Sequence, residues 1–131
     1  MKKTDLENTG DVKKLVDSFY DKVKVDTLLS PIFFEKIPGD WQIHMNKMYA
    51  FWNAALFGIP GYKGAPFMPH ATMKIDATHF NQWLHLFAET IHEHFEGPVA
   101  NDALHRAALM AKMFLKRIEE YKVNPNQVPL A

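Results

Sequence analysis

Apolar residues recur at helical spacing in four long segments of this sequence, and this repetition narrows the possible folds more than any other feature. Positions three and four apart lie on one face of an α-helix, so each segment presents a continuous apolar stripe. The segments lie at about 11–25, at 40–58, from 76 to the break at 96–98, and from 101 onward. No segment alternates apolar and polar residues as a strand does. The sequence therefore predicts an all-α fold.

Proline, glycine and short polar residues separate the predicted helices. Ser30, which precedes Pro31, is expected to cap a short helical turn, and Gly58 suits the position just past a helix end. After the "EGP" break at 96–98, Asn101 or Asp102 is expected to cap the last helix. The buried face of that helix is predicted to comprise Leu104, Ala107, Ala108, Ala111, Phe114 and Ile118.

The length and composition suit one domain spanning 1–131, with a short extension at 1–10 and a tail at 123–131. Lys plus Arg and Asp plus Glu both number 15, so no net charge favours nucleic acid or a membrane surface. The chain has no cysteine, which excludes disulfides and thiolate metal sites. No secretory signal follows the basic first residues, and we expect a cytoplasmic monomer.

Three residues with polar hydrogens lie on or beside the predicted inner faces of three different helices. These residues are Tyr20, His44 and Trp83. A purely structural core favours Leu, Ile or Val there, because buried N–H and O–H groups are costly unless paired. His70 stands apart in a short apolar segment that contains Pro66 and Pro69. This layout predicts a flat cofactor, with one protein ligand below it and a polar ligand site above.

The sequence resembles a globin, and more closely a group III truncated haemoglobin. The resemblance rests on several stretches in a fixed order: "FY" at 19–20, "SPIF" at 30–33, "DWQIHMNKMYAFW" at 40–52, "YKGAPFMPH" at 62–70 and "HFNQWLHLF" at 79–87. Together these stretches span about residues 11–121. The resemblance implies a two-over-two helical sandwich around haem b, with an imidazole as the proximal iron ligand.

By this resemblance, His70 is the metal ligand, and Tyr20, His44 and Trp83 form the distal, catalytic group. The resemblance also implies that Phe33, Phe51, Trp52 and Phe80 are aromatic residues of the haem pocket. Lys47, and more weakly Tyr62, could pair with a haem propionate. His79 departs from the usual apolar residue and could touch a haem edge. The full set of expected cofactor-binding residues is His70, Phe33, Lys47, Met48, Phe51, Trp52, Tyr62, Met73, His79 and Phe80.

The implied function is tight binding of O2, NO and CO at ferrous iron, suited to NO or peroxide chemistry rather than to O2 delivery. An NO dioxygenase would also need a reductase or another electron donor. Two or three hydrogen bonds to a ligand would slow its release, since each contributes about 0.5–1.5 kcal/mol. The alternative within the same family is a non-enzymatic protein that binds, scavenges or senses O2, NO or sulfide.

Two other classes of protein would account for parts of the sequence. Glu89 with His92, and Asp102 with His105, have the three-residue spacing found in carboxylate-bridged di-iron bundles. Such a site needs two further carboxylate-bearing helices, which the sequence does not supply in mid-helix positions. A plain helical interaction module would explain the aromatic residues but not the three inward donors.

Overall fold

The computed structural model describes residues 3–62 and 75–123, the last three by their backbone alone. Within these ranges the chain forms five helices and no strand beyond an isolated bridge between Thr4 and Phe95. The helices are α1 (Thr9–Val25), α2 (Ser30–Lys36), α3 (Trp41–Phe57), α4 (Ala77–His94) and α5 (Pro98–Val123). The predicted all-α fold is confirmed.

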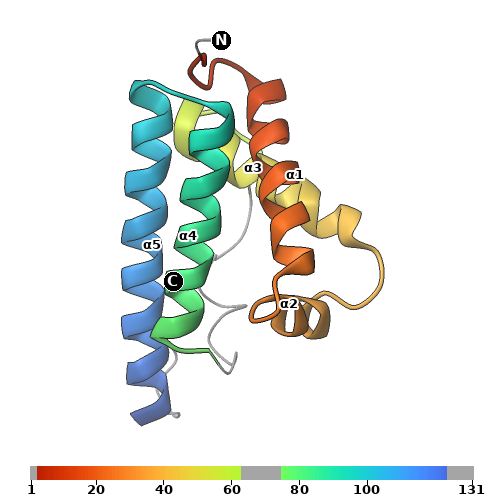
Figure 1. Ribbon diagram of the computed structural model, residues 1–131, viewed down its shortest axis with the longest axis vertical. Coiled ribbons are helices and arrows are strands. Elements are labelled where there is room, and N and C mark those ends of the chain that lie inside the picture. Colours follow the sequence, from red (N-terminus) through yellow and green to blue (C-terminus); the bar gives the residue numbers. More distant parts are fainter. Residues whose placement is uncertain (1–2, 63–74, 124–131) are drawn as a thin grey trace.

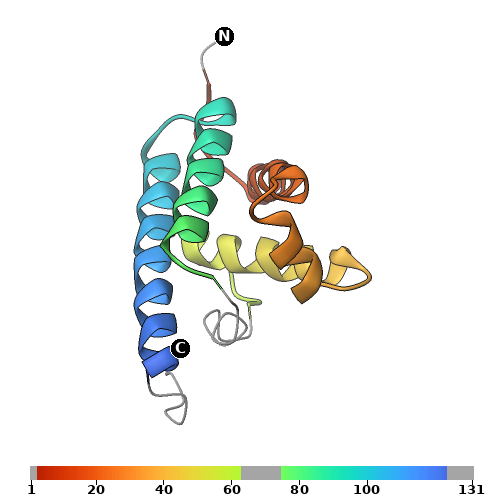
Figure 2. The ribbon, with the colours of Figure 1, turned by 60° about the horizontal axis from the view of Figure 1, so that its bottom comes forward.

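The long helices pair in two layers. α4 and α5 run antiparallel side by side, and α1 lies against α4 (Figure 1). α3 contacts both α1 and α5, and the second view shows it passing beneath α1 toward the α4–α5 pair (Figure 2). The short α2 packs against the end of α1. This is the predicted two-over-two sandwich. None of the described helices combines the length and apolar character needed to cross a membrane.

The core follows the apolar stripes. The buried residues of α1 are Val12, Leu15, Val16, Phe19, Tyr20 and Val23. The inner face of α5 differs in part from the prediction: Leu104 lies at its edge and Ala108 is exposed. The buried positions are Ala100, Ala103, Ala107, Ala111, Phe114 and Ile118. Because alanine side chains are short, this stripe lets α5 pack closely on its neighbours, and the larger Leu104 is displaced to the margin.

The last helix begins at Pro98, three residues before the expected caps, so the predicted start at Asn101 or Asp102 is wrong. The cap comes from another part of the chain. The Asp5 carboxylate accepts hydrogen bonds from the backbone N–H groups of Val99 (2.9 Å) and Ala100 (2.8 Å). A carboxylate at this end also complements the helix dipole. Asp5 therefore supplies from outside the helix what a local N-cap residue normally supplies.

The prediction that Ser30 caps the short helix is also wrong by one position, because α2 begins at Ser30 itself and its N-cap is Leu29. Asp26 organises this turn instead. Its carboxylate accepts from the backbone N–H groups of Leu28 (3.1 Å) and Leu29 (2.9 Å). The other carboxylate oxygen accepts from the Gln82 side chain at 2.7 Å, which ties the turn to α4.

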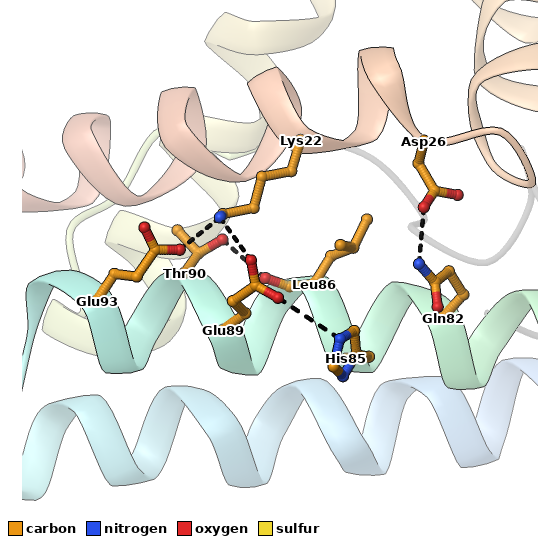
Figure 3. A network of polar contacts seen from close by, with 8 residues as sticks. All are labelled: Lys22, Asp26, Gln82, His85, Leu86, Glu89, Thr90 and Glu93. Carbon is orange, nitrogen blue, oxygen red and sulfur yellow. Dashed lines mark hydrogen bonds and ion pairs between the residues drawn. The ribbon is translucent and has the colours of Figure 1, made fainter.

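A cluster of charges joins the outer edges of α1 and α4 (Figure 3). The Lys22 ammonium reaches from α1 to the carboxylates of Glu89 (2.9 Å) and Glu93 on α4. Both carboxylates raise the pKa of Lys22, so the lysine is charged at neutral pH. His85 lies 3.5 Å from the second oxygen of Glu89. These contacts align the two helices beside the predicted site.

Candidate functional site

Tyr20 lies at the centre of the predicted distal group. Its side chain retains only 6% of its surface exposed, and burial raises the pKa of its phenol, which therefore keeps its proton at physiological pH. The hydroxyl makes no hydrogen bond with any residue in the described ranges. A hydrogen-bond donor contributes to stability or binding only where it meets an acceptor. The Tyr20 hydroxyl is therefore available to a bound ligand.

Aromatic rings surround Tyr20 on the side toward α2 and α3. Its ring meets His44 edge-on at 5.1 Å between centroids, and it meets Phe33 at 5.9 Å. Both residues were predicted site residues, and the structure brings them together with Tyr20. His44 itself is half-buried on α3.

Trp41 belongs to the same group, and the sequence analysis missed it. Its ring lies 6.1 Å from Tyr20 and 6.0 Å from His44, and the Lys24 ammonium lies over it at 4.7 Å. The one available signal was spacing: Trp41 precedes His44 by three residues and so shares its helix face.

Trp83 approaches from α4 and is linked to Tyr20 through Phe19. The Phe19 ring lies 5.0 Å from Tyr20 and 5.6 Å from Trp83, edge-on to both. Behind Trp83, the Phe87 ring contacts two indoles. Trp83 stacks with it at 5.7 Å and Trp52 at 5.1 Å between centroids, with interplanar angles of 12° and 21°. Phe19, Phe87 and Trp52 therefore fix the direction from which Trp83 enters the group.

The predicted cofactor face of α3 is apolar and only partly covered. Met48 and Phe51 pack against the core but remain half-exposed, whereas Trp52 is buried. Tyr62 contacts Phe51, with ring centroids 5.3 Å apart, and burial raises the pKa of its phenol. Lys47 is exposed and makes no ion pair within the described part of the chain.

Phe80 and His79, both at the start of α4, are placed differently from that group. Phe80 is buried in a second apolar cluster with Ile75, Phe114 and Ile118. The His79 Nδ1 accepts from the backbone N–H of Asp76 at 3.1 Å, and the pair forms a capping box. His79 thus has a local structural role that its sequence position did not reveal.

The expected iron ligand, His70, lies outside the described residues, as does Met73, so their predicted roles stay predictions. No group of three or more His, Cys, Asp or Glu side chains that could hold a metal ion occurs in residues 3–62 and 75–120. The carboxylate Glu89, required by the di-iron alternative, is paired with Lys22 instead, and His92 and His105 are exposed. That alternative receives no support.

Two crossed helix pairs with donor-bearing rings turned inward define a small globin of the truncated kind. A sequence model of the bacterial-like globin family matches residues 6–116, and the chain belongs to this family. It is 31% identical over 118 residues to the group 3 truncated hemoglobin ctb of Campylobacter jejuni, covering 87% of this chain and 93% of that protein. The crystal structure of the group III truncated hemoglobin from Campylobacter jejuni matches with a TM-score of 0.81 at 31% identity, covering 92% of this chain and 98% of that one. The predicted resemblance to group III truncated haemoglobins is confirmed.

Globins bind haem, and the described residues fit such a group. A porphyrin needs apolar walls, which the half-exposed Met48 and Phe51 on α3 offer. A ligand held on one side of it needs hydrogen-bond donors, and the Tyr20 hydroxyl lacks an acceptor among the described residues. A basic side chain such as Lys47 suits the propionates at the porphyrin edge. The donor set and the apolar face both match the chemistry of haem.

Proposed function

We propose that this protein binds haem b and, through it, O2, NO and CO, holding the gas tightly for reaction with NO or peroxide rather than for O2 delivery. The observation that carries this proposal is the Tyr20 hydroxyl, which makes no hydrogen bond in the described structure and belongs to a buried side chain surrounded by aromatic rings. A diatomic ligand supplies the missing acceptor. The experiment that tests it is a visible spectrum with and without carbon monoxide.

His70 is proposed as the iron ligand, with its neutral imidazole nitrogen toward the metal. Phe33, Met48, Phe51, Trp52 and Phe80 would contribute apolar contact, together with Met73. Lys47, Tyr62 and His79 would face the propionates or the porphyrin edge. Haem, when bound, supplies an iron centre that takes a gas as ligand and exchanges electrons.

The distal residues divide the remaining work. Tyr20 keeps its proton, because burial raises the pKa of its phenol, so it is available as a hydrogen-bond donor. The Trp83 indole N–H is donor-only by chemistry. His44 is the one member of the group that can exchange a proton near neutral pH, and we assign it proton delivery when peroxide is the substrate. Donors held in a low-dielectric site act more strongly than in water.

A non-enzymatic role in binding or sensing O2, NO or sulfide would use the same residues, so activity must separate the two. NO is added to the O2-loaded protein in a stopped-flow instrument, with a reductase and a pyridine nucleotide as electron source. Sustained conversion of NO to nitrate supports the enzyme. Survival of the O2-loaded form after NO addition, or a single turnover without regeneration, would assign the protein to the binding or sensing class.

The haem part of the proposal has an earlier and simpler test. The purified protein should show a Soret band that shifts on reduction and again on addition of carbon monoxide. A folded, helical preparation that remains colourless after hemin is added would contradict it.

A further inference from the structure

Three of the most easily oxidised side chains of the protein can be followed as one line, from Trp83 on α4 through Phe87 to Trp52 and Tyr49 on α3. The rings of Trp83 and Trp52 both lie nearly parallel to that of Phe87, at centroid distances of 5.7 and 5.1 Å. Tyr49 lies three residues before Trp52 on α3, so the two are neighbours on one helix face, with about 5–6 Å between Cβ atoms. The line leads from the predicted distal group to the contact between α1 and α3.

Tyr49 differs from the other described tyrosines because a proton acceptor lies beside its hydroxyl. A phenol that loses an electron also releases its proton, and it needs a base nearby. The Tyr49 hydroxyl donates to the Asp17 carboxylate, and Lys13 pairs with the other oxygen of that carboxylate at 2.6 Å. Neither Tyr20 nor Tyr62 makes a hydrogen bond to an acceptor within the described residues. Of the three tyrosines whose side chains are described, Tyr49 alone has a base in place.

The end of the line is accessible to solvent. The Asp17 side chain is 36% exposed, and Tyr49 is half-buried at the edge of the core. A proton taken by Asp17 can therefore reach water, and a small molecule can approach the Tyr49 ring. By contrast, Trp52 and Phe87 are 5% and 1% exposed, so the middle of the line is shielded from side reactions.

We propose that Trp83, Trp52 and Tyr49 form an electron relay, and that Tyr49 with Asp17 is a surface site where small phenols or aromatic amines are oxidised at the expense of peroxide. The proposal rests on the haem binding proposed above. Phe87 is not oxidised; its ring keeps the two indoles in a fixed stack. This adds a second reaction site, distinct from the one where gases bind.

The electrons and protons balance with hydrogen peroxide as oxidant and a phenol, AH, as reductant. Tyr49 gives up one electron through Trp52 and Trp83, and its proton passes to Asp17. AH then returns a hydrogen atom to Tyr49 and leaves as the radical A•. Two such cycles deliver two electrons and two protons, so H2O2 and two AH become two H2O and two A•.

The relay predicts where a radical collects when no reductant is present. Haem-loaded protein is mixed with hydrogen peroxide, frozen rapidly and examined by electron paramagnetic resonance, with ring-deuterated tyrosine or tryptophan incorporated to assign the signal. We expect a tyrosyl radical in the unaltered protein and its loss in Tyr49→Phe. Trp52→Phe should also lose the tyrosyl signal, with the remaining radical moved to tryptophan.

Tyr121→Phe is the matched control, because it removes a phenol that has no part in the proposed relay or in haem binding; its tyrosyl signal should persist. Asp17→Asn should keep the fold and slow formation of the radical. Circular dichroism and haem content establish that each variant is folded and loaded. Spin trapping followed by peptide mapping of the unaltered protein locates the radical without any substitution.

Turnover with guaiacol gives the functional readout. Tyr49→Phe should lose guaiacol oxidation, while the first reaction with peroxide, followed by the Soret change, keeps its rate. A tyrosyl signal that survives Tyr49→Phe, or that disappears in Tyr121→Phe, would overturn the relay and leave the haem proposal intact. Absence of a Soret band would instead contradict the haem proposal.

Discussion

At the scale of single residues, Tyr20 carries the proposed site for a gas ligand. Its neighbours Phe19, Phe33, Trp41 and His44 surround the ring edge-on, and its hydroxyl makes no hydrogen bond within the described residues. A phenylalanine would keep these ring contacts and remove only the hydroxyl. Under the haem proposal, a bound ligand is the acceptor for this hydroxyl.

Tyr20→Phe should speed O2 dissociation from the reduced protein by about tenfold, which corresponds to one lost hydrogen bond of about 1.4 kcal/mol. Haem content should not change, and the free energy of unfolding should hold or rise. Flash photolysis and O2 displacement by carbon monoxide measure the rate. Tyr121→Phe serves as the control for loss of a phenol elsewhere. An unchanged off-rate in Tyr20→Phe would remove this residue from the distal group.

Asp5 is a second residue whose side chain affects the stability of the fold. Its partial burial by itself favours the neutral acid, but three backbone hydrogen bonds, from Val99, Ala100 and Leu6, outweigh this effect and hold the pKa of the carboxyl below its ordinary value. Because the folded pKa lies below the unfolded one of about 3.9, the carboxylate stabilises the fold fully above that pH. The contribution is lost as pH falls through the folded pKa.

Asp5→Ala should lower the free energy of unfolding at neutral pH by about 1 kcal/mol, the usual cost of removing an N-cap. Asp5→Asn keeps an acceptor and should lose less at pH 7. Denaturant titrations between neutral pH and about pH 3 measure both. The difference between the native chain and the Ala variant should shrink at the acid end; a constant difference across the range would show that the ionised carboxylate contributes nothing.

At the scale of elements, the connection between α4 and α5 depends on the same carboxylate. Gly97 has a φ of 143°, and a Cβ added there would lie 2.6 Å from the Asp5 Cγ. Gly39 also has a positive φ, of 89°, but a Cβ there would meet no atom within 4 Å. A residue other than glycine would be strained at both positions, but only at Gly97 would its side chain clash with a neighbour.

Gly97→Ala should therefore destabilise the protein more than Gly39→Ala, by about 1–3 kcal/mol for the displaced contact in addition to the shared backbone penalty. Thermal and denaturant unfolding of both variants gives the comparison. Combining Gly97→Ala with Asp5→Ala should cost less than the sum of the two changes, because the second removes the obstacle met by the first. Strict additivity would mean that the two residues do not interact.

The helices could be predicted closely from periodicity. The error at the start of α5 has a physical cause. α3 and α4 begin after Asp40 and Asp76, as expected, because each cap lies next to its helix in sequence. The start of α5 was missed because its cap, Asp5, lies 94 residues away from Val99. Local patterns indicate which residues face inward, but they carry no information on which distant side chain completes a helix end.

The site residues also fall into two groups, those that the sequence indicates and those that it does not. Tyr20, His44 and Trp83 could be found from their helix faces and from the resemblance. Trp41 could not be found in this way, because a tryptophan at the start of a helix is compatible with a surface position and with a core position. The role of Tyr49 depends on a bond to Asp17 across two helices, and nothing in either residue's own segment indicates that bond.

At the scale of the whole molecule, the haem proposal makes the cofactor part of the structure. Half-exposed apolar side chains on α3 would be covered by a porphyrin, and burial of apolar surface contributes about 25 cal/mol per Å². Any group that binds only the folded chain also raises its stability by mass action. The loaded protein should therefore be markedly more stable than the stripped one.

His70→Ala should lose haem or bind it weakly, and its melting temperature should fall to that of the stripped protein. Differential scanning calorimetry with and without added hemin tests this. Imidazole added to the variant should restore part of the Soret absorbance by standing in for the missing side chain. Full haem occupancy in His70→Ala without imidazole would assign the iron ligand elsewhere.

The attachment of residues 3–6 to the far end of the α4–α5 hairpin has a consequence for synthesis. On the ribosome these residues emerge before α4 and α5, but the Thr4 carbonyl accepts from the backbone N–H of Glu96, and Asp5 accepts from Val99 and Ala100. Residues 3–6 can therefore settle only after the connection between α4 and α5 has been made. The 94 residues that separate Asp5 from Val99 must be synthesised before this early segment finds its partners.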